Sequence, residues 1–107
     1  MQYNNIEKLP EKEMIPGFRG RFIHTGDMTV SYWRVEKGST LPLHSHLHEQ
    51  VTQVIRGTLE LTVEGQTFIL KPGDVMSIAP YEKHEGKALE DCELQDIFRP
   101  EREDYKF

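Results

Sequence analysis

Apolar and polar residues alternate one by one over much of this chain, and this period of two constrains the fold more than any other feature. The clearest case is Thr58–Glu64, where Leu59, Leu61 and Val63 fall on one face and polar side chains on the other. Successive side chains of a β-strand point to opposite faces, so the segment is predicted to be a half-buried strand. No segment carries the sustained apolar spacing of a long amphipathic helix.

Other short segments with strand-like composition are separated by glycine, proline and charged residues. Gly65-Gln66 is predicted to be the turn of a hairpin, and Lys71–Asp74 to be the next break. Many short strands joined by close turns are typical of an all-β sandwich or barrel. The further strands are predicted at Phe18–Ile23, Met28–Val35, Val51–Ile55, Thr67–Leu70, Val75–Ala79 and Cys92–Phe98.

A length of 107 residues suits one domain. We expect a single domain over residues 1–107, with an N-terminal arm over about residues 1–15. The C-terminal tail, residues 100–107, is expected to line the mouth of the barrel. A short helical turn is possible in either terminal segment.

Charge and cysteine content exclude several classes of protein. The chain has 13 basic and 18 acidic residues, a net charge of −5, and no basic block, so nucleic acid is not an expected partner. The single cysteine, Cys92, excludes an internal disulfide and is expected to pack in the core. The N-terminal residues lack the pattern of a secretory signal, and no apolar run could cross a bilayer, so we expect a cytoplasmic protein without a membrane partner.

Three histidines alternate at positions 44, 46 and 48, and they are the clearest candidates for a metal site in the sequence. Strand residues two apart share a face at about 6.6 Å, so such a pair can converge on one metal ion. In a straight strand Gln50 would lie about 20 Å from His44, and a shared site therefore requires a bend around Leu47–Glu49. From the residues alone, the pair could be His44 and His46 or His46 and His48, or the segment could be an exposed polar loop.

The spacing of these residues resembles the first signature of the cupin superfamily, G-x5-H-x-H-x3,4-E-x6-G. The positions in register are Gly38, His44, His46, Gln50 and Gly57. The second signature is matched by Pro72-Gly73-Asp74, Pro80 and His84, whereas Glu82 and Ala88 replace its last glycine and its asparagine. The resemblance implies a single small antiparallel β-barrel, or jelly roll, that binds one divalent metal ion through His44, His46, Gln50 and His84.

Gln50 stands where the cupin signature has a glutamate. A neutral amide leaves the full charge of a divalent ion in place, which favours Lewis-acid chemistry over redox chemistry. Imidazole-rich sites accept several ions, and nickel, zinc and iron(II) are the candidates. The register places His48 in the turn or beside the ligands, while His24, next to Thr25-Gly26-Asp27, is predicted to be a surface turn residue without a role.

Asp96 is predicted to point into the barrel, because it alternates with Leu94 and Phe98 on the more apolar face of its strand. An interior carboxylate is costly unless it is paired, so one in a cavity is a candidate functional group. The alternative is a carboxylate held in a structural ion pair.

The segment Asp96–Tyr105, together with Pro42–His46 and His48–Gln50, resembles the KdgF family of short cupins. These proteins convert the 4,5-unsaturated uronate released by pectin and alginate lyases into its linear 4-deoxy-5-keto form. The resemblance implies that Asp96 acts as general acid and base, that Phe98 packs on the sugar, and that Arg102 acts in catalysis and binds the substrate carboxylate.

Alternatives to these assignments remain open at the level of sequence. Arg102 could be a solvated charge paired with Glu101 or Glu103, and Arg19 and Arg21 are weaker candidates for binding the substrate carboxylate. The expected partners are a small sugar acid and a second copy of the chain. The competing functions are a non-catalytic metal- and sugar-binding cupin and an iron(II) cupin dioxygenase.

Overall fold

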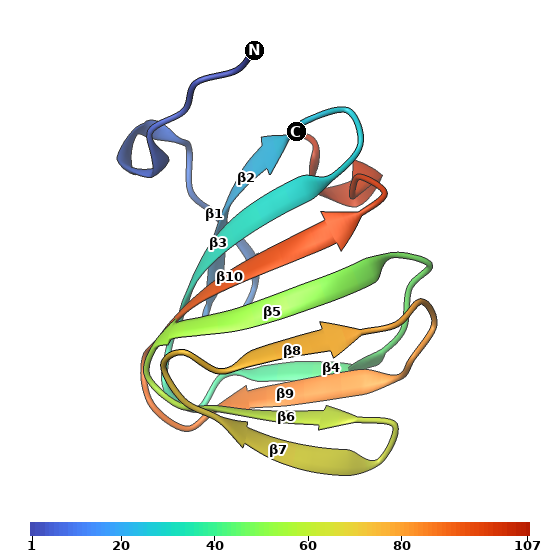
Figure 1. Ribbon diagram of the computed structural model, residues 1–107. Helices are drawn as coiled ribbons and strands as arrows, with labels where there is room; N and C mark the ends of the chain where they lie inside the picture. The colour runs from blue at the N-terminus through green and yellow to red at the C-terminus, as the bar shows by residue number, and fades with distance from the viewer.

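The computed structural model describes all 107 residues, which form ten strands and two 3-10 turns (Figure 1). No helix is long and apolar enough to span a membrane. The turns are η1 (Ile6–Lys8) and η2 (Glu103–Tyr105), and the strands are β1 (Lys12–Ile15), β2 (Phe18–His24), β3 (Thr29–Val35), β4 (Thr40–His44), β5 (Glu49–Arg56), β6 (Leu59–Val63), β7 (Gln66–Leu70), β8 (Val75–Ile78), β9 (His84–Ala88) and β10 (Cys92–Arg99).

The strands form two antiparallel sheets. One has six strands in the order β1-β2-β3-β10-β5-β8, and the other has four in the order β4-β9-β6-β7. In the six-stranded sheet β10 lies between β3 and β5, strands from distant parts of the sequence. The predicted all-β, single-domain barrel is confirmed, because residues of both sheets contribute to one hydrophobic core.

The β6–β7 hairpin shows how local sequence sets the register. Val63 pairs with Gln66, which leaves Glu64 and Gly65 as a two-residue turn with φ of 48° and 77°. Turns of this kind need positive φ at both central residues, and glycine adopts it without strain. The turn therefore lies one residue earlier than the predicted Gly65-Gln66.

Seven of the ten strands coincide with predicted segments, while β1, β4 and β9 were not predicted. The burial pattern of β6 alternates strictly, with Leu59, Leu61 and Val63 buried. Burial does not alternate regularly in β4, whereas in β9 it does, with His84 and Ala88 buried and Glu85 and Lys87 exposed. Their pairing with each other, and that of β9 with β6, makes them strands.

The core is a cluster of 12 buried residues from both sheets, including Trp33, Val54, Leu61 and Ile78. Cys92 belongs to it, as predicted, and burial raises the pKa of its thiol. Close packing of these side chains joins the two sheets, and the barrel needs no disulfide.

The chain passes from one sheet to the other within residues 45–48. Strand β4 ends at His44 in the four-stranded sheet, and β5 begins at Glu49 in the six-stranded sheet, with bends at Leu47 and His48. The bend that a shared metal site requires is therefore present. The β4–β5 and β8–β9 connections lie at the same end of the barrel (Figure 1), so both histidine-bearing segments reach one region.

Candidate metal centre

Three of the four predicted ligands are histidines that meet inside the barrel. His44 ends β4, His84 begins β9, and the two are register partners, while His46 follows in the β4–β5 connection. Ring atoms of the three lie within 4.8 Å of one another, which is close enough for all to bind one ion. His48 is not part of this cluster, so the structure selects His44 with His46 rather than His46 with His48.

A backbone carbonyl lies beside Nδ1 of each of the three rings. The distances from Nδ1 to the carbonyl oxygens of Pro42, His48 and Glu82 are 2.8, 3.1 and 2.9 Å for His44, His46 and His84 respectively. A carbonyl oxygen can only accept, so Nδ1 of His44 and of His84 carries the hydrogen, and Nε2 of each keeps a free lone pair, as a metal ligand requires. His46 differs from them, because an oxygen that can only accept lies beside each of its ring nitrogens.

Gln50 brings a fourth donor atom to the cluster. Its Oε1 lies 3.0 Å from Nε2 of His46, and its Nε2 donates to Oγ1 of Thr52 at 2.9 Å. A neutral imidazole has one N–H, so only one of the two oxygens beside His46 can accept from it, and the other faces a lone pair. A cation between Nε2 and Oε1 removes that conflict when Nδ1 donates to the carbonyl of His48. Nε2 of His84, which is buried without a hydrogen-bond partner, gives a second reason for a cation. The residues thus fit a divalent transition metal.

The protonation of these rings also suits metal binding. Burial, with smaller effects of Arg102 and His84, lowers the pKa of His46 to about 4. Burial is also the main cause that lowers the pKa of His84. Both rings are therefore neutral at physiological pH, the state in which imidazole is a ligand.

His48 lies beside the ligands, as predicted. Its carbonyl accepts from His46, and its own Nε2 donates to the carbonyl of Glu101 at 3.2 Å. Burial lowers the pKa of its ring. His48 therefore connects the metal-binding connection to the C-terminal segment.

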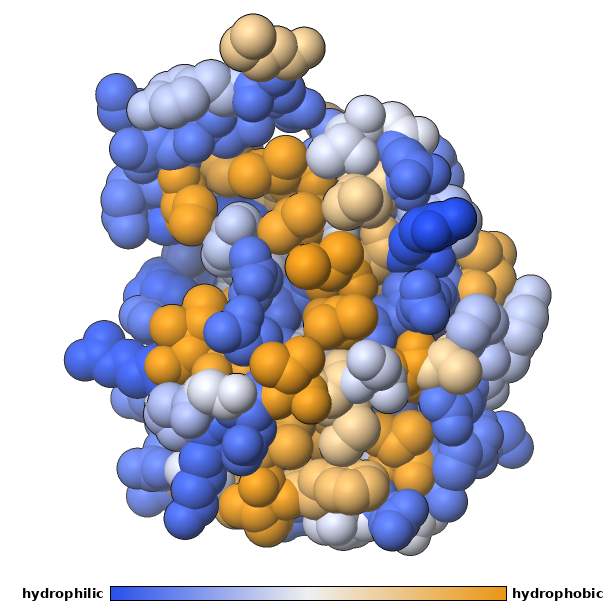
Figure 2. Space-filling model, viewed as in Figure 1, coloured by the Kyte–Doolittle hydropathy of each residue, from blue (hydrophilic) through white to orange (hydrophobic).

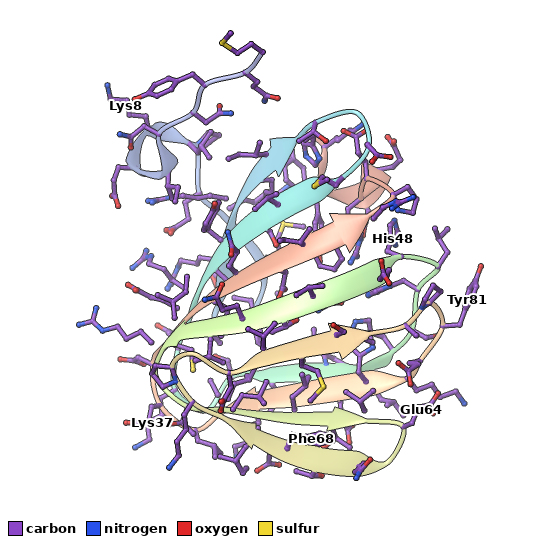
Figure 3. All side chains as sticks on the ribbon, in the orientation of Figure 1. Lys8, Lys37, His48, Glu64, Phe68 and Tyr81 are labelled. Carbon is purple, nitrogen blue, oxygen red and sulfur yellow. The ribbon has the colours of Figure 1, made fainter.

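A cavity of about 300 Å³ lies between the two sheets. Side chains from both sheets point into the barrel (Figure 3), and His48 lies at the end of the barrel where β5 begins. Apolar residues dominate the lining, and polar groups also contribute to it. Those polar groups are His44, Gln50, Thr52, His84, Asp96, Arg102 and Asp104.

Asp96 lies in this cavity, with its side chain turned inward between those of Leu94 and Phe98, as the alternation predicts. Its Oδ1 is buried without a hydrogen-bond partner, and no ion pair involves it, so the alternative of a structural ion pair is wrong. Burial raises the pKa of this carboxyl to about 6, against smaller lowering effects of Thr52, Arg102 and Trp33.

Arg102 is buried over the same cavity, with 9% of the residue exposed. Its guanidinium lies 4.7 Å from the ring centre of Phe98 and 4.1 Å from that of Tyr105, in cation–π contact with both. Its Nε and Nη2 donate to the carboxylate of Asp104 at 3.0 and 2.7 Å. The solvated pairing with Glu101 or Glu103 is therefore wrong, since both of those pair with Lys106.

Arg19 and Arg21 lie on the outer face of the six-stranded sheet and do not line the cavity. Arg19 is 3.8 Å from Glu36, and Arg21 is 3.8 Å from both Glu7 and Glu11. The sequence did not show which face of the strand they occupy. In the structure they occupy the outer face, so they cannot bind a substrate in this cavity.

His24 has contacts that the sequence did not predict. It ends β2 and is half-buried: its Nδ1 lies 2.8 Å from Oγ1 of Thr29, and its Nε2 donates to the carbonyl of Tyr105 at 3.2 Å. The prediction of a surface turn residue without a role is thus wrong. No local signal indicated this, because Tyr105 is 81 residues away in sequence.

An antiparallel two-sheet barrel with three clustered histidines and an amide oxygen beside them defines a small cupin whose residues are compatible with a metal ion. The chain matches the cupin domain family over residues 31–98, which include every candidate ligand. It is 30% identical over 102 residues to the pectin degradation protein KdgF of Dickeya dadantii (strain 3937), covering 92% of this chain and 93% of that protein.

Solved structures agree with this assignment. KdgF from Halomonas sp. superposes with a TM-score of 0.94 at 27% identity, covering 99% of both chains. An RmlC-like cupin from Shewanella frigidimarina NCIMB 400 gives the same TM-score at 23% identity, over 99% of this chain and 96% of that one, and shows the fold alone. The chain therefore belongs to the cupin family and, within it, to the KdgF group.

Proposed function

We propose that this protein is a metal-dependent enzyme that converts a 4,5-unsaturated uronate monosaccharide into the linear 4-deoxy-5-keto uronate. The observation that carries the proposal is the buried carboxylate of Asp96, with one oxygen unpartnered, in the cavity that two histidines of the cluster, His44 and His84, also line. Membership of the KdgF group supports the substrate class, since the relative in Dickeya dadantii is a pectin degradation protein.

The reaction is an isomerisation, so it needs no co-reactant. The hydroxyl on C1 loses its proton, the bond from C1 to the ring oxygen breaks, and C1 becomes an aldehyde. The former ring oxygen becomes the enolate oxygen on C5, and a proton added at C4 gives the ketone. One carboxylate can remove the first proton and deliver the second, and Asp96 is the cavity's buried carboxylate with a free oxygen.

His44, His46, Gln50 and His84 would hold the divalent ion, with nickel, zinc and iron(II) as candidates. When bound, the ion supplies Lewis-acid polarisation of substrate oxygens. The amide of Gln50 does not neutralise that charge. A pKa of about 6 lets Asp96 be ionised at neutral pH and yet remain a usable proton donor.

Arg102 and Phe98 are the proposed substrate-binding groups. The guanidinium is fixed by two aromatic rings, so little side-chain freedom is lost when an anion binds. The side chain of Asp104 is 60% exposed, compared with 10% for that of Arg102. A substrate carboxylate can therefore displace Asp104 into solvent and take over its bonds to Arg102.

The test is to add metal-loaded protein to unsaturated galacturonate and follow the loss of absorbance of the conjugated double bond. Asp96→Asn should lower kcat at least about 100-fold, the usual size of a general acid–base contribution. Glu93→Gln is the matched control, because Glu93 lies on the same strand but pairs with Arg56 on the outer face.

Three outcomes would contradict the proposal. Equal rates for wild type and Asp96→Asn would remove Asp96 from the mechanism. Sugar binding without loss of the double bond would identify a non-catalytic binder. Oxygen uptake during turnover would identify a dioxygenase, because ring opening consumes no oxygen.

A further inference from the structure

We propose that Thr52 is a positioning residue that fixes the amide of Gln50 with its oxygen toward the metal site. The inference rests on the metal site proposed above and goes beyond it, because it assigns a residue outside the four candidate ligands. It also explains how a glutamine can serve at a position where the cupin signature has a glutamate.

A glutamine ligand has an orientation problem that a glutamate ligand lacks. The two oxygens of a carboxylate are equivalent, so either can face a cation. An amide has one oxygen with lone pairs and one NH₂ group that can only donate. A half-turn of the amide would aim that NH₂ group at the ion and abolish binding, although it would change the shape of the side chain very little.

The contacts of Gln50 select the productive orientation. Its Nε2 donates to Oγ1 of Thr52 at 2.9 Å, and this places Oε1 3.0 Å from Nε2 of His46. Gln50 and Thr52 are 6% and 3% exposed, so no solvent competes for either group. Both side chains point into the barrel from β5, two residues apart on one face.

The hydrogen of the Thr52 hydroxyl has an acceptor other than Gln50 nearby, the carboxylate of Asp96. Thr52 is the register partner of Asp96 on β10, and both side chains line the same cavity. A carboxylate can only accept, so it attracts the one hydrogen of the Thr52 hydroxyl, whose oxygen accepts from Gln50. A flipped amide would present its oxygen to the oxygen of that hydroxyl and compete with the carboxylate for the hydrogen, and this disfavours the flip.

The decisive measurement is the affinity of metal-free protein for Zn²⁺ or Ni²⁺, determined by competition with a chelator and without any sugar present. Thr52→Val removes the hydroxyl at nearly constant shape and should weaken ion binding about 10-fold or more, the range found for residues that orient metal ligands. Thr52→Ser keeps the hydroxyl and should stay within about threefold of wild type.

Testing Thr52→Val in a Gln50→Glu variant distinguishes a role in orienting the amide from a general loss of packing. In Gln50→Glu protein both ligand oxygens are equivalent, so adding Thr52→Val should change the ion affinity by less than about threefold. Thr62→Val is the control for a threonine lost elsewhere, because Thr62 bonds Thr67 on the outer face of the other sheet. If valine at position 52 prevents folding, as thermal unfolding of the metal-free protein would reveal, Thr52→Ala takes its place in both backgrounds.

The proposal is overturned if Thr52→Val binds the ion as tightly as wild type, or if it weakens binding equally with and without the Gln50→Glu substitution. Since the titration contains no uronate, its result is independent of the proposed reaction. Loss of turnover in Asp96→Asn combined with unchanged ion affinity in Thr52→Val would leave the proposed function standing and remove the positioning role.

Discussion

The buried carboxyl group of Asp96 lowers the stability of the protein when it is ionised, and this effect can be measured without any substrate. Burial raises its pKa from the usual 3.8 to about 6, so the native state holds this proton more tightly than the unfolded chain does. Stability is therefore greatest when the group is protonated. It falls as pH rises from about 4 to about 6, since the native state must then lose a proton from a buried site.

Asp96→Asn should consequently stabilise the metal-free protein at pH 7.5, by on the order of 1–3 kcal/mol. The gain should disappear near pH 3.5, where aspartic acid is itself neutral. Urea unfolding at both pH values measures the difference. Glu93→Gln should stay within about 0.5 kcal/mol at both, as surface substitutions usually do. Equal stability of wild type and Asp96→Asn at pH 7.5 would contradict the buried, unpartnered carboxylate.

The three-histidine cluster makes a second prediction at this scale. An ion that binds only the native state raises the free energy of unfolding, by about 2.7 kcal/mol at a concentration of 100 times Kd. Zinc or nickel should therefore raise the thermal midpoint, and a chelator should reverse the rise. His84→Ala should abolish the effect, whereas His48→Gln should retain it, because the ring of His48 is outside the cluster. Loss of the shift in His48→Gln alone would point to the other histidine pair.

Some of these residues could be predicted from sequence, and the reason is local. Signature spacing marked the histidines and Gln50, and the alternation along Cys92–Phe98 placed Asp96 inside the barrel. The role of His24 could not be predicted, since it depends on contacts with Thr29 and with the distant C-terminal segment. The phase of Arg19 and Arg21 was equally open, because Ile23 shares their face of the strand and His24 shares the face of the two phenylalanines.

At the scale of elements, β9 shows where prediction from sequence stops. Its sequence, His-Glu-Gly-Lys-Ala, alternates charged residues with His84, Gly86 and Ala88, but it contains no large apolar or β-branched residue. It is nevertheless a strand, because β4 and β6 flank it and pair with its backbone on both sides. Tertiary pairing outweighs local preference here. This strand carries His84, so the element hardest to predict holds one of the best-predicted ligands.

The C-terminal segment 101–105 is held in place by side chains of the β2–β3 hairpin. The backbone N–H of Arg102 donates to Oγ1 of Thr29 at 2.9 Å, so the Thr29 hydroxyl can donate to Nδ1 of His24. His24 in turn bonds the carbonyl of Tyr105. Thr29 is fully buried, and one hydroxyl thus joins both ends of the segment. Through it the hairpin places Arg102 and Tyr105 over the cavity.

Thr29→Val should loosen this segment without touching the metal ligands. It leaves the Arg102 N–H without its partner, at a cost of about 1–3 kcal/mol. We expect a KM for the uronate about 5- to 100-fold higher, with ion affinity unchanged and faster hydrogen exchange over Glu103–Lys106. Thr29→Ser should restore all three. An unchanged KM together with unchanged exchange would show that the segment does not depend on this hydroxyl.

At the scale of the whole molecule, the outer face of the six-stranded sheet carries an apolar row. Figure 2 shows hydrophobic residues extending across this side of the molecule, over β3, β10, β5 and β8. The register aligns Ile97 with Val30 on one side and with Val51 on the other, and Val30 in turn with Ile23. These four side chains are partly exposed, and a continuous apolar surface of this kind marks an interface more often than a free surface.

We propose that two copies of the chain pair through this row as a C2 dimer. A twofold axis needs a self-complementary patch, and an uncharged row meets that condition without placing like charges opposite each other, which matters for a chain of net charge −5. Light scattering should then give twice the chain mass of 12.5 kDa. Ile97→Glu puts a carboxylate at the centre of the row, and a charge buried there without a partner should weaken the dimer at least about 100-fold. Because this face is opposite the cavity, ion affinity should not change. A monomeric wild type would contradict the dimer, and an Ile97→Glu protein that still pairs would place the interface elsewhere.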